Sequence, residues 1–132
     1  EEALKSFGFH LGMAFQMADD LLDYTATAQE LGKNPGADMR EGKLTLPLIH
    51  SLERADEKER ENMLEMVLDP EFHPDKFQSL KQKILDLGGI EYTRSLAGEH
   101  VRKAKEQIGV FEDSDSRSLL GLIADYSVSR KV

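Results

Sequence analysis

Residues 15–24 read Phe15-Gln16-Met17-Ala18-Asp19-Asp20-Leu21-Leu22-Asp23-Tyr24, which sets three carboxylates at the end of a long apolar run. Residues 7–18 leave almost no polar face, and a helix that is apolar on every side is usually buried in a bundle. Because helical residues are about 100° apart, Asp19 and Asp23 lie roughly 40° apart on one face, with Asp20 beside them. Buried like charges need a compensating cation, and an oxygen-seeking dication such as Mg²⁺ is the natural candidate. The alternative is a solvated acidic surface, which is common on helices.

The composition favours a single all-helical domain spanning residues 1–132. Of the 132 residues, 39% are hydrophobic and 32% charged, a balance that suits helices with long solvated faces. Acidic residues outnumber basic ones by 25 to 17, for a net charge of −8, which argues against nucleic acid or an anionic membrane as a partner. The absence of cysteine excludes disulfides and thiolate metal sites. Without a visible signal peptide or a bilayer-length apolar span, we expect a cytoplasmic protein with no stable membrane insertion.

Apolar periodicity and breakers predict helices over about residues 2–24 and 46–54, a third that Asp56 opens before the break at 69–74, and a fourth from about Pro74 that Gly88-Gly89 stops. A fifth helix is predicted over 90–108, and Ser114 or Asp115 caps the last one. Thr45 followed by Pro47 is typical of a helix N-terminus, and Gly88-Gly89 is typical of a C-cap. Residues 25–40 contain a proline and two glycines and predict a loop, with one turn of helix possible at 28–31. No strand-like alternation is present, so the predicted fold class is all-α, an antiparallel helical bundle.

Each predicted helix after the first has an apolar face that we expect to be buried. These faces are Leu46, Leu48, Ile49 and Leu52; Met63, Leu64, Met66 and Val67; Phe77, Leu80, Ile84 and Leu87; Tyr92, Leu96, His100 or Val101, Ala104 and Ile108; and Leu119, Leu120, Leu122, Ile123 and Tyr126.

Three further residues are placed as a metal and anion site would need them. Lys33 lies in the Gly/Pro loop after Asp23, and Lys43 follows a glycine just before the second helix; ammonium groups and metal ions together bind phosphate well. Either lysine alone is equally a solvated loop residue. Gln16 lies one turn before Asp19, where it can bond a ligand oxygen or a neighbouring helix. The four histidines are dispersed, with no paired ligand spacing, and we expect each to be structural or exposed.

The order of these motifs resembles one family. Phe15-Gln16-x-x-Asp19-Asp20-x-x-Asp23, then Gly32-Lys33, Gly36-x-Asp38 and Gly42-Lys43-x-Thr45-x-Pro47, is similar to the second aspartate-rich region of trans-isoprenyl diphosphate synthases, with long-chain octaprenyl- or heptaprenyl-type enzymes nearest. The match covers residues 7–52, and the remaining residues agree with the family in helical pattern. The resemblance implies an isoprenoid-synthase-type helical fold.

The resemblance also implies a prenyltransferase that condenses isopentenyl diphosphate onto an allylic diphosphate with Mg²⁺. It assigns Asp19 to direct metal ligation, Asp20 and Asp23 to ligation directly or through water, and Gln16, Lys33 and Lys43 to the leaving diphosphate. Asp19, Asp20 and Lys33 would be the catalytic residues. We also expect a homo-oligomer, namely a homodimer. Product length is not encoded in these motifs.

The family's first aspartate-rich motif has no counterpart in this sequence, so we expect a C-terminal portion of a longer enzyme that is inactive alone. We also expect self-association through Phe7, Phe9, Leu11 and Phe15. One alternative is a non-catalytic helical subunit that partners an active synthase, although a degenerate subunit has no physical need for clustered carboxylates. Another is a plain helical interaction domain with a fortuitous acidic patch.

Overall fold

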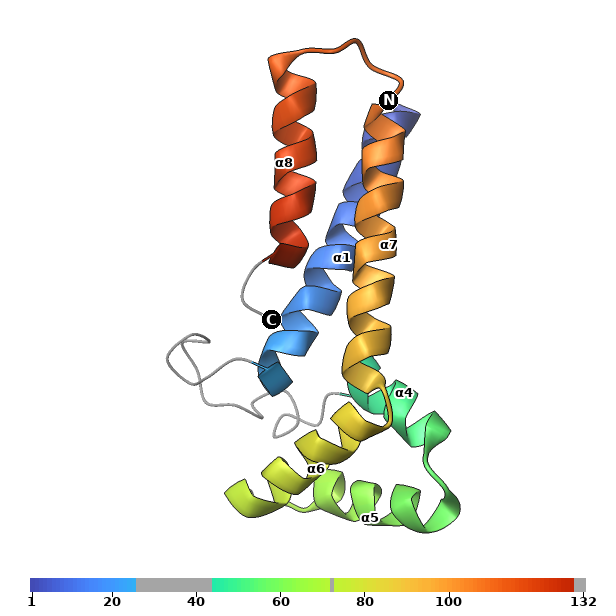
Figure 1. Cartoon of the computed structure of the whole chain (residues 1–132), viewed down its shortest axis with the longest axis vertical. Coiled ribbons are helices and arrows are strands. Elements are labelled where there is room, and N and C mark those ends of the chain that lie inside the picture. Colours follow the sequence, from blue (N-terminus) through green and yellow to red (C-terminus); the bar gives the residue numbers. More distant parts are fainter. Residues whose placement is uncertain (26–43, 72, 130–132) are drawn as a thin grey trace. The chain divides into compact units, whose positions relative to one another are not determined.

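The computed structural model describes residues 1–25, 44–71 and 73–129, and every regular element within those ranges is a helix (Figure 1). The helices are α1 (Glu2–Thr25), α4 (Leu46–Arg54), α5 (Glu57–Leu68), α6 (Pro74–Asp86), α7 (Gly89–Ile108) and α8 (Asp115–Ser129). The predicted all-α class is therefore confirmed, with helix bounds close to those predicted. The predicted loop beyond Thr25, with its helical turn at 28–31, lies outside the described residues.

The chain divides into two compact units, one of residues 1–19 with 94–132 and one of residues 20–93. In the first unit, α1, α7 and α8 run side by side, and α7 is antiparallel to the other two (Figure 1). In the second unit, α6 contacts both α4 and α5 (Figure 1). The prediction of one domain over residues 1–132 stays a prediction.

The core of the first unit is built largely from small side chains. Ala14 of α1, Ala104 of α7 and Ala124 of α8 are fully buried, so the helices pack closely where these residues meet. The remaining buried members of this cluster are Phe7, Val101 and Ile108, with Leu11, Phe111, Leu120 and Val128 packed against it. A small-residue interface of this kind lets helix backbones approach one another.

The predicted inner face of α8 is wrong in four of its five positions. Only Leu120 packs against the core, whereas the others are exposed: Leu119 57%, Leu122 65%, Ile123 43% and Tyr126 67%. The physical reason is that α8 turns Ala124 and Ser127, which are buried, toward its neighbours. Hydropathy identified the more apolar face of this helix, but the face with the smaller side chains is the one that packs against the neighbouring helices.

Three other helices also differ from their predicted faces. On α7, Tyr92 was predicted to face inward but is 41% exposed. α4 buries Pro47, Leu48 and Ser51, while Ile49 is exposed. Ser51 can be buried without loss of a hydrogen bond, because its hydroxyl donates to the carbonyl of Pro47 at 2.8 Å. α1 is not buried on every side, since Leu4, Phe9, Met13 and Phe15 are exposed. Phe7 and Leu11 already pack within the chain, so of the four side chains predicted to drive self-association only Phe9 and Phe15 present large exposed rings.

The predicted start of α5 and the predicted breaks before and after α6 are confirmed. Asp56 caps α5 by accepting a hydrogen bond from the Glu59 amide at 2.8 Å, and α6 begins at Pro74 after the predicted break. At its other end, Gly88 has φ +82°, a left-handed conformation that favours glycine. The chain turns there and enters α7, so Gly88 joins the two helices as predicted.

Gly89 brings the start of α7 against α4 and α6. A Cβ atom at this position would overlap the carbonyl oxygen of Pro47 and the hydroxyl of Ser51, and would lie 3.0 Å from Cγ2 of Ile84. Backbone atoms at such a contact cannot move aside cheaply. The absence of a side chain at residue 89 is therefore a condition for the packing of the second unit.

We predict that Gly89→Ala lowers the free energy of unfolding by about 1–3 kcal/mol, as overpacking of a tight contact does. The matched control is Gly98→Ala, also on α7, where a Cβ would meet no described atom within 4 Å and the helical alanine should stabilise by about 0.5–1 kcal/mol. Urea unfolding followed by circular dichroism measures both. Equal effects of the two substitutions would show that the contact at Gly89 is not limiting.

Candidate functional site

The three predicted metal ligands all lie on the last two turns of α1. Asp19 and Asp20 are half-buried, and Asp23 is 1% exposed. Leu21 and Tyr24, on the same turns, are equally buried. A carboxylate so far removed from water is costly unless it is compensated, so the sequence-based expectation of an acidic residue in a buried setting holds for Asp23.

The turn that carries Asp23 is fixed through its neighbour Tyr24. The Tyr24 hydroxyl lies 3.3 Å from Oγ1 of Thr45, the residue that precedes α4, and its ring stacks on Phe77 of α6 with centroids 6.2 Å apart. One residue further on, the Thr25 hydroxyl donates to the Leu21 carbonyl at 2.8 Å. These contacts fasten the acidic end of α1 to the beginning of α4 and the middle of α6.

Thr45 performs a different task from the one predicted. It occupies the N-cap position of α4, as expected, but its side chain makes no capping hydrogen bond. The hydroxyl is buried beside Tyr24 instead. Sequence reasoning found the helix start but missed the Tyr24–Thr45 pair, because a contact across 21 residues leaves no local pattern.

The predicted diphosphate ligands are only partly described. Gln16 is exposed on α1, so its amide is accessible to a ligand. Lys33 and Lys43 lie outside the described residues. Lys43 is two residues before Thr45 in the sequence.

The donor set suits a hard dication. Carboxylate oxygens are the ligands that Mg²⁺ prefers, and Mg²⁺ usually binds one or two carboxylates together with water and substrate phosphate oxygens. Within residues 1–25, 44–71 and 73–129, no group of three or more His, Asp or Glu side chains converges to hold a metal ion. Asp19, Asp20 and Asp23 therefore do not form a closed metal-binding group by themselves.

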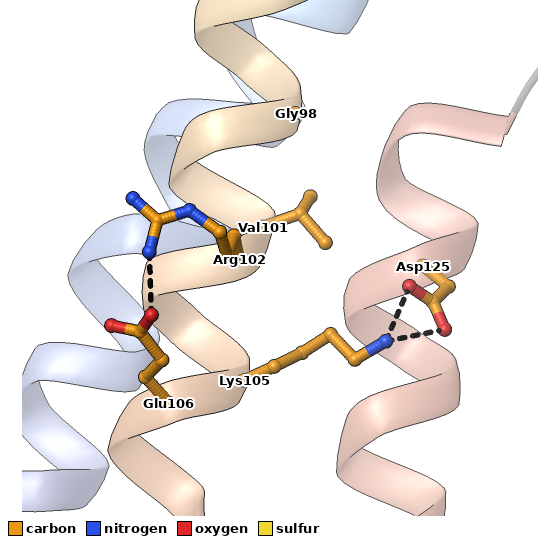
Figure 2. Close-up of a pocket in the computed structure, with 6 residues that line it drawn as sticks. All are labelled: Gly98, Val101, Arg102, Lys105, Glu106 and Asp125. Atoms are coloured by element: carbon orange, nitrogen blue, oxygen red, sulfur yellow. Dashed lines mark hydrogen bonds and ion pairs between the residues drawn. The ribbon is translucent and has the colours of Figure 1, made fainter.

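A cavity of about 440 Å³ lies between α7 and α8 (Figure 2). Val101 and Gly98 line it, and the Lys105 ammonium donates to both carboxylate oxygens of Asp125 at 3.1 and 3.2 Å. Arg102 likewise pairs with Glu106. Because both cations are already matched by carboxylates, the cavity has no net positive charge for an anionic ligand.

In the part of the chain that the structure describes, no helix is long and apolar enough to cross a membrane. The predicted cytoplasmic location stays a prediction.

We predict that Tyr24 and Thr45 are energetically coupled. Tyr24→Phe and Thr45→Val each remove one hydroxyl while keeping the ring stack and the side-chain shape, and a direct hydrogen bond should give a coupling of about 0.5–1.5 kcal/mol in a double-mutant cycle. Chemical unfolding of the wild type, the two single variants and the double variant measures it. Strictly additive losses would mean that the two hydroxyls do not stabilise each other.

Comparison with known proteins gives concordant results. The sequence model of the polyprenyl synthetase family matches residues 1–84. The chain is 39% identical over 130 residues to the short chain isoprenyl diphosphate synthase of Methanothermobacter thermautotrophicus, covering 98% of this chain and 39% of that protein. It is 35% identical to the octaprenyl diphosphate synthase of Escherichia coli, covering 98% and 40%.

Solved structures show the same likeness. A polyprenyl synthase from Caulobacter crescentus, crystallised in complex with calcium and isoprenyl diphosphate, superposes with a TM-score of 0.91 at 39% identity, covering 99% of this chain and 40% of that one. The chain thus spans about two fifths of the length of these relatives.

Proposed function

Because the chain belongs to the polyprenyl synthetase family, we propose that it forms one wall of the Mg²⁺ and diphosphate site of a prenyl diphosphate synthase. The observation that carries the proposal is the set of three carboxylates on the last two turns of α1, with Asp23 buried. The reaction would join isopentenyl diphosphate to an allylic diphosphate, with diphosphate leaving and a proton lost, so that the allylic chain grows by one isoprene unit.

The chemistry of the substrates explains the residue types. A departing diphosphate accumulates negative charge, and bound Mg²⁺ would neutralise that charge. Asp19 would bind the metal directly, while Asp20 and Asp23 would bind it directly or through water. Gln16 would donate its amide to the diphosphate, and Lys33 and Lys43 would hold it as point charges.

Two findings support this assignment. The Tyr24–Thr45 contact holds the start of α4 at the acidic end of α1, and the segment that precedes Thr45 is the one that contains Lys43. The Caulobacter relative was crystallised with calcium and isoprenyl diphosphate, and calcium, like Mg²⁺, is an oxygen-binding dication. The same ligand classes on this chain would engage Asp19, Asp20 and Asp23.

We predict that the chain binds inorganic diphosphate only in the presence of Mg²⁺. Asp19→Asn and Asp23→Asn should each weaken that binding at least tenfold, because they remove a metal-binding charge while nearly preserving shape. Isothermal titration calorimetry measures the affinity, with circular dichroism as a check on folding. Asp113→Asn, an exposed acid in the turn between α7 and α8, is the control and should leave binding unchanged. Binding that survives both site substitutions would overturn the role of the α1 carboxylates.

We also predict that the 132-residue chain alone does not elongate an allylic diphosphate. The chain supplies one wall of carboxylates, and in our proposal a second wall on a facing helix is required to hold the metal ions. Incubation with radiolabelled isopentenyl diphosphate, geranylgeranyl diphosphate and Mg²⁺, followed by extraction of the products, tests this. Labelled polyprenyl products would show that the chain is sufficient and that the one-wall proposal is wrong.

The alternative, a non-catalytic helical subunit of a heteromeric synthase, makes the opposite forecast for the first experiment. A subunit without chemistry has no reason to bind diphosphate through Mg²⁺ at α1.

Self-association is a separate proposal. A homo-oligomer would form through Phe9 and Phe15 of α1, whose rings are exposed.

A further inference from the structure

His10 of α1 and His100 of α7 form a hydrogen-bonded pair within the first unit. Their Nδ1 atoms lie 2.9 Å apart, and the ring centroids are 5.1 Å apart. Phe9 packs edge-on against both rings, with centroid distances of 5.1 Å to His10 and 6.4 Å to His100. The pair links two helices across 90 residues of sequence, and the dispersed histidines in the sequence gave no sign of it.

The number of protons that this geometry accepts is limited. A hydrogen bond between two Nδ1 atoms requires one of them to carry the proton and the other to accept it. A first additional proton can enter at the Nε2 atom of the donor ring, which makes that ring cationic and leaves the hydrogen bond intact. A second must enter at the accepting Nδ1, which turns both atoms into donors and places two cations side by side.

The surroundings act in the same direction. Burial lowers the pKa of His100, the charge on His10 across the pair lowers it further, and Lys103 on α7 adds to the effect. Glu99, also on α7, raises the pKa of His100 but is the weakest of the four influences. Burial, His10 and Lys103 together outweigh Glu99 and oppose full protonation of the pair.

We propose that His10 and His100 form an acid-sensitive link between α1 and α7, closed when the pair carries no more than one extra proton and opened by the second. The link does not depend on the function proposed above, because neither histidine belongs to the metal or diphosphate site. Opening of the link would free α1 from its contact with His100 of α7, and α1 is the helix that also carries Asp19, Asp20 and Asp23.

The direction of the pH effect follows from linkage. Because His100 in the folded chain has a lower pKa than in the unfolded chain, the unfolded chain binds more protons once the pH falls below the ordinary histidine value of about 6.5. The contribution of the pair to stability is therefore present above that pH and is lost as the pH falls through the lowered pKa of His100. Two interacting sites of this kind titrate in two steps that belong to the pair.

The test is a titration of the histidine ring resonances by NMR between about pH 8 and about pH 5. In the wild-type chain, we expect the His100 resonances to titrate in two steps. In His10→Gln, His100 should titrate in a single step, and the fall in melting temperature on acidification should be at most half that of the wild type. His50→Asn is the control, because His50 stacks on Tyr92 in the second unit; it should leave the two-step titration unchanged.

A single-step titration of His100 in the wild-type chain would overturn the proposal. So would an identical loss of melting temperature on acidification in the wild type and in His10→Gln. If His10→Gln fails to fold, the titration of His100 in the wild-type chain still decides whether the two rings share protons.

Discussion

The burial of one carboxylate, that of Asp23, constrains the structure at the acidic end of α1. Asp23 is 1% exposed, and a charge in such a place must be compensated within the protein. The turn around Asp23 therefore has to keep one position relative to its neighbours. The stack of Tyr24 on Phe77 and the hydroxyl contact with Thr45 hold it in that way.

Polar contacts hold α1 in both units of the chain. In the first unit, His10 pairs with His100; in the second, Tyr24 meets Thr45. Each contact joins α1 to a segment far away in sequence, and each involves groups that lose a hydrogen bond if the helix slides. Apolar packing alone, built on small residues such as Ala14 and Ala104, specifies helix position less sharply than these directional bonds do.

Much of the fold could be predicted from local signals, and the parts that could not share one cause. Breakers and caps such as Asp56, Pro74 and Gly88 act on their own turns, so the helix bounds followed from the sequence. The family resemblance likewise rested on Asp19, Asp20 and Asp23 at fixed spacing. Which face of α8 is buried, the His10–His100 pair and the burial of Ser51 all depend on a partner element, and hydropathy carries no information about the shape of that partner. Whether the carboxylates bind Mg²⁺ is a question of ligand chemistry that neither periodicity nor backbone geometry answers.

The orientation of α8 has a consequence for anyone who redesigns this protein for solubility. Its large apolar residues Leu122 and Tyr126 are exposed, while Ala124 and Ser127 are buried. Polar replacements on the exposed stripe would leave the three-helix core untouched, whereas a single bulky replacement at Ala124 would push α8 away from its neighbours. A design guided by average hydrophobicity would keep the exposed residues and alter the buried ones.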